Sequence, residues 1–210
     1  MSDPERSSEP RPYHHGDLKT ALLAQAEAIL ERDGIHALTL RGAARAAGVS
    51  HAAPANHFGD LTGLLSELAA VGFNRFSAAL RAAVAAAGDE PSARAKAMGT
   101  AYVTFARAHP GLFLLMFRGE RLDAARPALR EAIEASRGAL RAVATGFAAG
   151  GAKLPPLRLA AQAAAHWALV HGFSMLLLDG RLRGLIDSLP QGLGADELLD
   201  AVLETTRIGD

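Results

Sequence analysis

Cysteine is absent from this chain of 210 residues. Without thiols, the protein can form neither disulfide bonds nor a thiolate zinc site. Valine and isoleucine are few, and no alternating apolar and polar run of strand length stands out, so a β-sheet is not expected. Alanine and leucine dominate a composition that is 50% hydrophobic, and both residues favour helices. The sequence therefore predicts an all-α protein, with enough chain for one or two domains.

The chain also lacks a segment suited to crossing a membrane. Its longest apolar run, Ala163–Leu178, contains two histidines and a serine and falls short of the about 20 apolar residues that a span needs. The first twelve residues, Met1–Pro12, are polar and contain proline, so we expect a disordered arm and not a secretory signal. We therefore expect no membrane partner and a cytoplasmic location.

An excess of positive charge is missing as well. The 22 Lys and Arg residues balance the 22 Asp and Glu residues. The first 60 residues hold six Lys or Arg against eight Asp or Glu, with five histidines. Because affinity for nucleic acid depends heavily on neutralised phosphates, this balance argues against tight DNA binding by a single domain. A dimer that doubles the contacts, or a locally basic face, would still permit it.

Enzyme signatures are not found either. The sequence has no glycine-rich phosphate loop, no nucleophile elbow, no HExxH zinc motif and no paired carboxylates at catalytic spacing. The adjacent His14 and His15 do not share a helix face, and His51 and His57 lie six residues apart, which does not make a chelating pair. We therefore expect no catalytic residues, no metal and no cofactor.

The most informative segment is Thr39–Phe58, which reads TLRGAARAAGVSHAAPANHF. It contains two short helical patterns, the first of which Thr39 can cap. Gly48 can end that helix in the left-handed conformation, and Ser50 can cap the next one. Pro54 would then be the fourth residue of the second helix, where it forfeits only the first intrahelical hydrogen bond. A helix, a tight turn and a second helix form the geometry that places one helix in a DNA major groove.

Residues Tyr13–Phe76 resemble the DNA-binding domain of the tetracycline-repressor (TetR) family of bacterial regulators. The motifs that carry this resemblance are Tyr13-His14-His15-Gly16-Asp17-Leu18, a first helix over Asp17–Arg32, Leu38-Thr39-Leu40-Arg41, Ala47-Gly48-Val49-Ser50, His51-Ala52-Ala53-Pro54, His57-Phe58 and Leu64-Leu65. Trp167-Ala168-Leu169-Val170-His171-Gly172 resembles the C-terminal domain of one branch of the family. The resemblance implies a ligand-responsive repressor that binds a palindromic operator as a homodimer and is released by a small apolar effector.

The candidate DNA-contacting residues lie in the two short helices and the turn between them. They are Thr39, Arg41, Ser50, His51, Ala52, Ala53, Asn56 and His57. Asparagine can read adenine with two hydrogen bonds, small alanines allow close approach to base edges, and the other polar side chains can reach phosphates or bases. The alternative is a structural helix pair whose histidines and asparagine are merely solvated.

Two positions depart from the family pattern. The family usually has tyrosine where this chain has Ala55, and lysine where it has Leu61. Both residues commonly contact DNA in the family, so their absence implies a weaker or differently arranged grip on the backbone. A helical ligand-binding or interaction protein that keeps the fold but has lost DNA binding therefore stays open as an alternative, which a salt-dependent DNA titration separates.

Apolar spacing predicts about nine helices. The resemblance implies that a helix–turn–helix head over residues 13–60 is followed by a ligand-binding and dimerisation body over residues 61–210. The helices expected beyond the head cover Leu61–Ala87, residues 91–109, Leu112–Phe117, Asp123–Ala149, Leu157–Asp179 and Ala195–Ile208, with Arg181–Gly194 as a loop. A loop bounded by Gly150-Gly151 and Pro155-Pro156 precedes the most apolar helix. We expect the last two long helices to form the dimer interface.

Candidate effector-binding residues are the aromatic, methionine and histidine side chains that recur at helical spacing in the body. They are Tyr102, Phe105, His109, Phe113, Met116, Phe117, Trp167, His171 and Met175. An apolar pocket with a few polar groups is what a small-molecule site needs, although an ordinary core uses the same residues. Trp167 and His171 share a helix face, and both carry polar nitrogens that need partners when buried.

Overall fold

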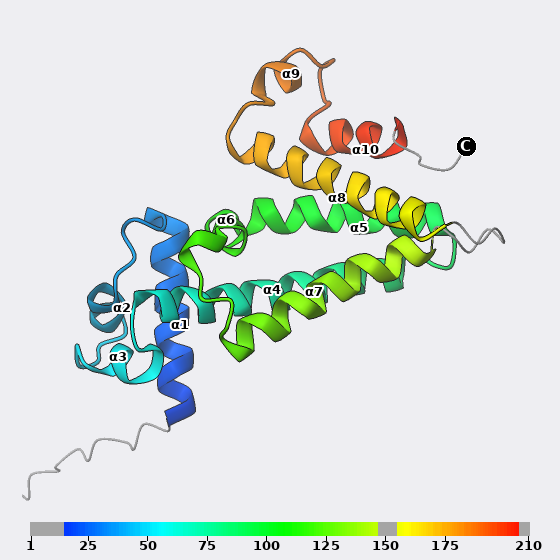
Figure 1. Ribbon diagram of the computed structural model, residues 1–210. Helices are drawn as coiled ribbons and strands as arrows, with labels where there is room; N and C mark the ends of the chain where they lie inside the picture. Colours follow the sequence, from blue (N-terminus) through cyan, green and yellow to red (C-terminus); the bar gives the residue numbers. More distant parts are fainter. Residues whose placement is uncertain (1–14, 147–154, 206–210) are drawn as a thin grey trace, which may run out of the picture.

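The computed structural model describes residues 15–146 and 155–205, with side chains over residues 18–141 and 155–205. These two stretches contain ten α-helices and a short 3-10 helix but no strand, which confirms the predicted all-α fold (Figure 1). The helices are α1 (His15–Asp33), α2 (Leu40–Ala46), α3 (Ala53–Phe58), α4 (Leu61–Ala86), α5 (Pro91–Ala108), α6 (Pro110–Met116), η1 (Gly119–Arg121), α7 (Pro127–Gly146), α8 (Pro156–Leu178), α9 (Arg183–Asp187) and α10 (Ala195–Thr205).

Three expectations fall outside the described residues. They are the disordered arm over residues 1–12, the loop beginning at Gly150-Gly151 and the end of the last helix at residues 206–208.

The first three helices form a small head around one apolar centre. Leu22 and Leu30 of α1, Ala43 of α2 and Phe58 of α3 are all buried there. The predicted cap at Thr39 is confirmed, since its hydroxyl accepts a hydrogen bond from the Gly42 N–H at 3.0 Å. α2 then ends as expected, because Gly48 adopts a φ of +67° at the start of the turn.

The long helix α4 connects the head to the body without an intervening linker. It begins at Leu61, with only two residues between it and the end of α3 at Phe58, and it contacts both α1 and α3. The same helix packs on α5, α6 and α7 further along, with Leu68, Phe76 and Leu80 buried. α8 lies across α5, and α10 lies beside α5 near the end of the chain (Figure 1).

Two helix predictions were wrong in position. The segment Arg181–Gly194, expected to be a loop, contains α9, because Leu182 and Ile186 lie one helical turn apart and both pack against the core. α7 begins at Pro127 and not at Asp123. The Pro127 ring disfavours helical backbone at the preceding residue, and Asp123 instead accepts from the Ala125 N–H in a turn, at 3.0 Å.

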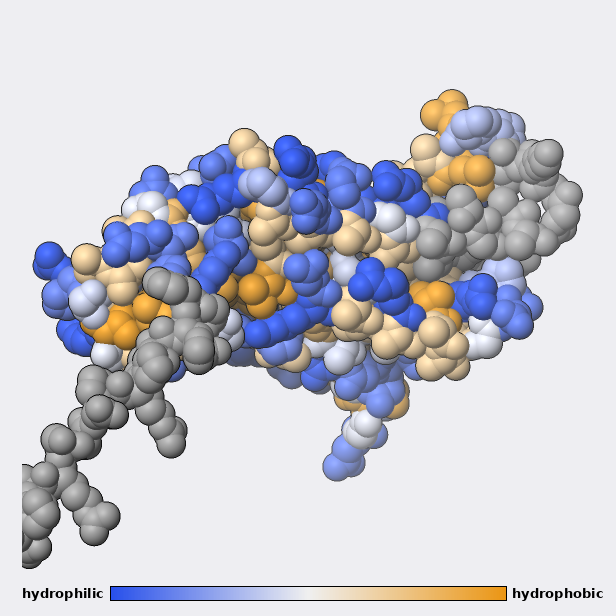
Figure 2. Space-filling view, turned by 90° about the horizontal axis from the view of Figure 1, so that it is seen from below, coloured by the Kyte–Doolittle hydropathy of each residue, from blue (hydrophilic) through white to orange (hydrophobic). Residues whose placement is uncertain are grey.

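The underside of the body carries hydrophilic residues interleaved with hydrophobic ones (Figure 2). Such mixing is ordinary for a surface that faces water. No helix in the part of the chain that the structure describes is long and apolar enough to cross a membrane.

Candidate nucleic-acid interface and effector site

The proposed recognition helix starts later than the sequence predicted. Ser50 does not cap it, because the Ala53 N–H bonds to the Ser50 backbone oxygen at 3.1 Å in a turn that precedes the helix. The residue at the N-cap is Ala52, whose methyl group accepts no hydrogen bond. Pro54 therefore occupies the second helical position and not the fourth. At the second position the missing N–H of proline costs no intrahelical hydrogen bond.

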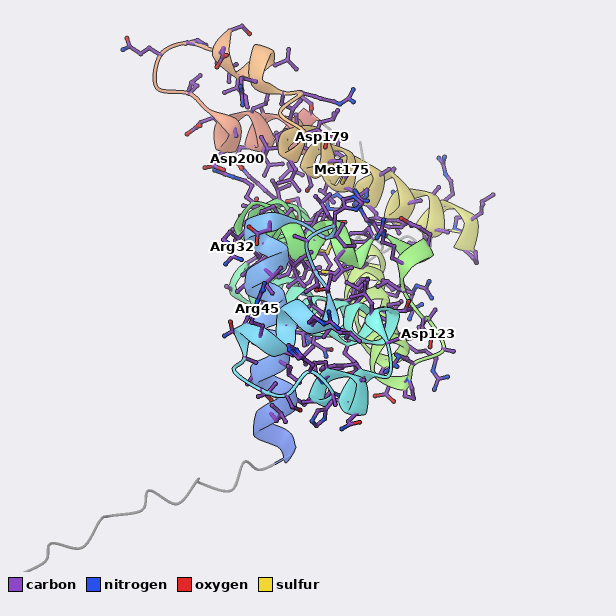
Figure 3. All side chains as sticks on the ribbon, turned by 90° about the vertical axis from the view of Figure 1, so that its left-hand side faces the viewer. Arg32, Arg45, Asp123, Met175, Asp179 and Asp200 are labelled. Carbon is purple, nitrogen blue, oxygen red and sulfur yellow. The ribbon has the colours of Figure 1, made fainter. Side chains whose placement is uncertain are left out.

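The outward faces of α2 and α3 expose most of the predicted contact residues. Pro54 and Phe58 are buried and hold the inner side of α3 against the head. The side chains exposed to solvent are Thr39, Arg41, Arg45, Ser50, His51, Ala52 and Asn56, whereas Ala53 and His57 are half-buried. Figure 3 looks onto the head and labels Arg45 on α2. Six of the eight predicted contact residues are thus exposed on α2, α3 and the segments beside them.

The acidic side chains of the head are largely engaged elsewhere. Glu27 pairs with Arg75 of α4, and Asp33 pairs with its neighbour Arg32. Two further acids serve helix starts: Glu31 accepts from the N–H groups of Gly111 and Leu112, at 2.8 and 2.9 Å, and Asp60 accepts from the Gly63 N–H at 2.8 Å. Each of the four acids of the head whose side chains the structure describes therefore has a partner within the protein.

The basic side chains of α2 are differently placed. Arg41 and Arg45 are exposed and form no ion pair with any residue that the structure describes. The one lysine of the head, Lys19, pairs instead with Glu67 of α4 at 2.8 Å. The two arginines are consequently the cations that this face offers to an external anion.

The two positions that depart from the family pattern have different surroundings. Ala55 is exposed on α3, so only a methyl group faces solvent there. Leu61 is the first residue of α4 and is half-buried, with its side chain packed against the core. The chain therefore replaces one potential DNA contact by open space and the other by an apolar contact between head and body.

Arg126 links the body to the end of α3 and was missed in the sequence, because no local pattern marks it. Its Nη2 donates to the backbone oxygen of Phe58 at 2.6 Å, and its Nη1 lies 3.6 Å from Glu67 Oε1. Gly63 makes room for this contact, since a Cβ there would lie 1.9 Å from the same Phe58 oxygen and 2.4 Å from the Arg126 guanidinium. Asp123 is tied to α4 as well, through its N–H and the Ser66 hydroxyl at 2.8 Å.

In the body, a polar chain of three side chains crosses from α8 to α5. Trp167 Nε1 donates to the Tyr102 hydroxyl at 3.3 Å, and that hydroxyl lies 3.0 Å from His171 Nδ1. Tyr102 is completely buried, whereas His171 is half-buried and Trp167 is 45% exposed. The three polar groups that needed partners thus satisfy one another.

Aromatic rings from α6, from the residue that follows it and from α8 lie around His171. Its ring centroid lies 4.7 Å from that of Phe117, 5.7 Å from Phe113 and 6.1 Å from Trp167. The structure therefore unites five of the nine predicted effector-site residues. The remaining four lie elsewhere in the core: Phe105 stacks on Phe76 and His109, Met116 packs at Gly72, and Met175 packs against the core one turn beyond His171.

Burial shifts the pKa values of the titratable side chains in and beside this cluster. It raises the pKa of the Tyr102 hydroxyl well above its usual range, which the hydrogen bond from Trp167 opposes only in part. It lowers the pKa of the His171 imidazole, and that of His166 one turn earlier on α8. Tyr102 and His171 are therefore both neutral at pH 7, and the site presents hydrogen-bonding groups without charge.

A separate open groove of about 650 Å³ runs between α5 and α10. Its lining mixes polar side chains, among them Thr100, Thr104 and Asp200, with the apolar Ala108 and Leu199. An ion pair between Arg107 and Asp196 bridges the two helices there. None of the predicted effector residues lines this groove. Among the described residues, no group of three or more metal-ligating side chains is placed to hold a metal ion.

The chain is similar to proteins of one family along most of its length. Residues 95–205, more than half of the chain, match the family described as "Tetracyclin repressor-like, C-terminal domain". A protein of unknown function from Rhodococcus sp. RHA1 is 40% identical, with a TM-score of 0.76 over 93% of this chain and 96% of that one. A search of curated proteins found no match.

More distant solved structures share the fold. The TetR family transcriptional regulator PfmR from Thermus thermophilus is 20% identical, with a TM-score of 0.61 over 87% of this chain and 94% of its own. The ketosteroid transcriptional regulator KstR2 of Mycobacterium tuberculosis is 17% identical, with a TM-score of 0.56 over 89% and 92%. Because the family match covers more than half of the chain and follows a helix–turn–helix head, the chain belongs to the tetracycline-repressor family of non-enzymatic, DNA-binding transcriptional regulators.

Proposed function

We propose that the protein is a ligand-responsive transcriptional repressor that binds a palindromic operator as a homodimer and is released by a small apolar effector. The observation that carries the proposal is the helix–turn–helix of α2 and α3, where six of the eight predicted contact residues are exposed and Arg41 and Arg45 form no ion pair with any described residue. A regulator of this kind acts on the chromosome, in the bacterial cytoplasm.

The head offers separate groups for positioning and for reading. Arg41 and Arg45 supply positive charge to phosphates, and Thr39 sits at a helix start that favours an anion. Asn56 and His51 are exposed on α3 and on the turn before it, where they can reach base edges in a major groove. Ala52 and Ala53 leave the backbone close to the bases. These roles support the proposal of sequence-specific binding.

The outer face of α8 supports a dimer. Residues 159–178 contain no Asp, Glu, Lys or Arg, and Leu157, Trp167 and Leu176 are 80%, 45% and 42% exposed. Exposed alanines, including Ala164 and Ala168, lie between these large side chains. A helix with so apolar an outer face needs a partner. A second protomer supplies it when α8 and α10 of each copy pack against the same helices of the other in a self-complementary interface.

Contacts between head and body connect the proposed effector site to the helices of the head. Phe113 of α6 and Phe117, the residue after α6, border His171, while Glu31 of α1 accepts from the first N–H groups of α6. The segment after α6 reaches the end of α3 through Arg126. An effector that favours another placement of α6 would therefore shift the heads, provided that it binds the free conformation more tightly than the DNA-bound one.

One observation favours a second candidate function. Ala55 leaves open space, and Leu61 turns inward, at the two positions where the family commonly contacts DNA. A ligand-binding protein of the same fold without DNA binding would show these features.

Selection of duplexes from a random library, followed by titration at several salt concentrations, decides between the two candidates. The repressor should enrich a palindrome and bind it at least about 1,000-fold more tightly than a scrambled duplex. Its affinity should also fall steeply with salt, because phosphate contacts release counterions. Equal, weak binding to both duplexes at low salt would favour the ligand-binding protein.

A further inference from the structure

The hydrogen bonds around Tyr102 determine which nitrogen of His171 carries the proton. An indole N–H can only donate, so the Tyr102 oxygen accepts from Trp167. The single hydrogen of the Tyr102 hydroxyl is then free to be donated to His171 Nδ1, which lies 3.0 Å away. A neutral imidazole that accepts at Nδ1 carries its hydrogen on Nε2.

The opposite arrangement leaves a buried donor without a partner. If His171 Nδ1 donated to the Tyr102 oxygen, the hydroxyl hydrogen would have no acceptor among the contacts that the described residues provide. Tyr102 has no exposed surface, so water cannot take that place. Buried donors are nearly always paired, and the first arrangement is therefore favoured.

The Nε2–H of His171 is consequently a donor that no hydrogen bond within the described residues uses. The rings of Phe113, Phe117 and Trp167 lie around this imidazole, and none of them can accept a conventional hydrogen bond. His171 and Phe117 are only half-buried, so the ring remains reachable from outside. A single hydrogen-bond donor among apolar side chains that a ligand can reach is typical of a small-molecule site.

We propose that His171 Nε2–H is the anchoring donor of the effector site, and that the effector is an uncharged, mainly apolar molecule with a carbonyl oxygen that accepts from it. This inference rests on the proposed function, because it names the ligand of the same regulator. A carboxylate is disfavoured, since no cation among the described residues contacts this imidazole and the imidazole itself is neutral. A pure hydrocarbon would leave the donor unpaired.

Three compounds of nearly equal size test this chemistry: 4-phenyl-2-butanone, butylbenzene and 3-phenylpropionate. Trp167 is the only tryptophan of the chain and contacts His171, so its emission reports binding at the site. The melting temperature, which rises when a ligand binds the native state, provides a second readout. The ketone should bind about tenfold more tightly than the other two, the value of one neutral hydrogen bond.

Two variants assign the preference to His171. His171→Phe should reduce the affinity for the ketone about tenfold and leave that for butylbenzene unchanged, because one hydrogen bond is lost and the ring remains. His109→Phe is the matched control, since His109 contacts Phe105 and not the cluster at His171, and it should keep the preference. If His171→Phe does not fold, ¹⁵N shifts of the wild-type imidazole still test the assignment, with the proton expected on Nε2.

Several results would overturn the inference. They are tighter binding of the carboxylate, a ketone preference that survives His171→Phe, binding of none of the three compounds, or a proton found on Nδ1. A wild type without any preference for the ketone, together with a His171→Phe variant that no longer dimerises, would also overturn it. These results would mean that the Nε2–H of His171 bonds to the partner protomer and not to a ligand. The duplex selection needs no effector, so failure of DNA binding and failure of this inference are distinguished by separate measurements.

Discussion

Arg126 Nη2 lies 2.6 Å from the backbone oxygen of Phe58, so a side chain just before α7 holds the last turn of α3, the proposed recognition helix. The final carbonyl groups of a helix lack intrahelical partners and carry partial negative charge, which a guanidinium complements. Glu67 lies 3.6 Å from the same guanidinium and also pairs with Lys19, so α1, α3, α4 and the body meet at one cluster of contacts.

Arg126→Gln should loosen α3 without removing any side chain that faces DNA. We expect affinity for the operator to fall several-fold while affinity for a scrambled duplex stays the same, because only specific binding needs α3 in place. Loss of the charged hydrogen bond should lower the free energy of unfolding by about 1–2 kcal/mol. Arg137→Gln, which removes an exposed arginine of α7, is the control. Equal losses on both duplexes would contradict a positioning role.

Asn56→Ala and His51→Ala should weaken operator binding and leave the fold intact. Both side chains are exposed, so their removal leaves no cavity in the core. If Asn56 reads a base, its loss costs about 1–3 kcal/mol on the operator and relaxes the preference at that base pair. Asn74→Ala, an exposed position on α4, is the matched control. Wild-type affinity in both variants, with unchanged helicity, would exclude α3 as the reading helix.

Leu61→Lys should strengthen DNA binding regardless of sequence. The aliphatic stem of lysine can cover the apolar surface that Leu61 covers, while the ammonium group reaches solvent. One added phosphate contact in each protomer of a dimer steepens the slope of log K against log salt by about 2. Leu61→Met preserves the packing without the charge and serves as control. A lower melting temperature with an unchanged slope would mean that this position does not face the DNA.

Charge on the outer face of α8 should break the dimer. Ala164→Glu and Ala168→Glu place carboxylates on a face whose neighbouring residues are apolar, and two protomers would bring these charges together. Light scattering at micromolar concentration should show a wild-type dimer and a monomeric double variant. Ala135→Glu on the exposed side of α7 should stay dimeric. A wild-type monomer at this concentration would contradict the proposed interface.

Stability should decrease as the pH falls from about 6.5 toward the lowered pKa values of His166 and His171. Burial lowers both values, so in this window the unfolded chain binds more protons than the native one, and protonation favours unfolding. Above the unfolded pKa the contribution is constant. Urea unfolding between pH 5.5 and 7.5 should show this slope, and His171→Phe should reduce it. An identical slope in that variant would mean that His171 is not protected from protonation.

The sequence by itself determined the features that depend on neighbouring residues. Thr39 caps α2 and Gly48 ends it, because a cap needs one hydroxyl three residues before a free N–H, and the turn needs one residue that tolerates a positive φ. The helical class followed equally from apolar spacing, and family membership from motifs read along the chain.

Only the tertiary structure decided which residues meet across long separations. Arg126 reaches Phe58 over 68 positions, and Tyr102 reaches His171 over 69, so no local pattern reveals either contact. The same is true of Glu31, an acid of the head that accepts from the N–H groups at the start of α6. The start of α3 and the helix α9 were mistaken in the sequence because packing, and not local propensity, selected them. Composition counts charges and rings, whereas the fold decides which of them are already paired and which remain free to bind a partner.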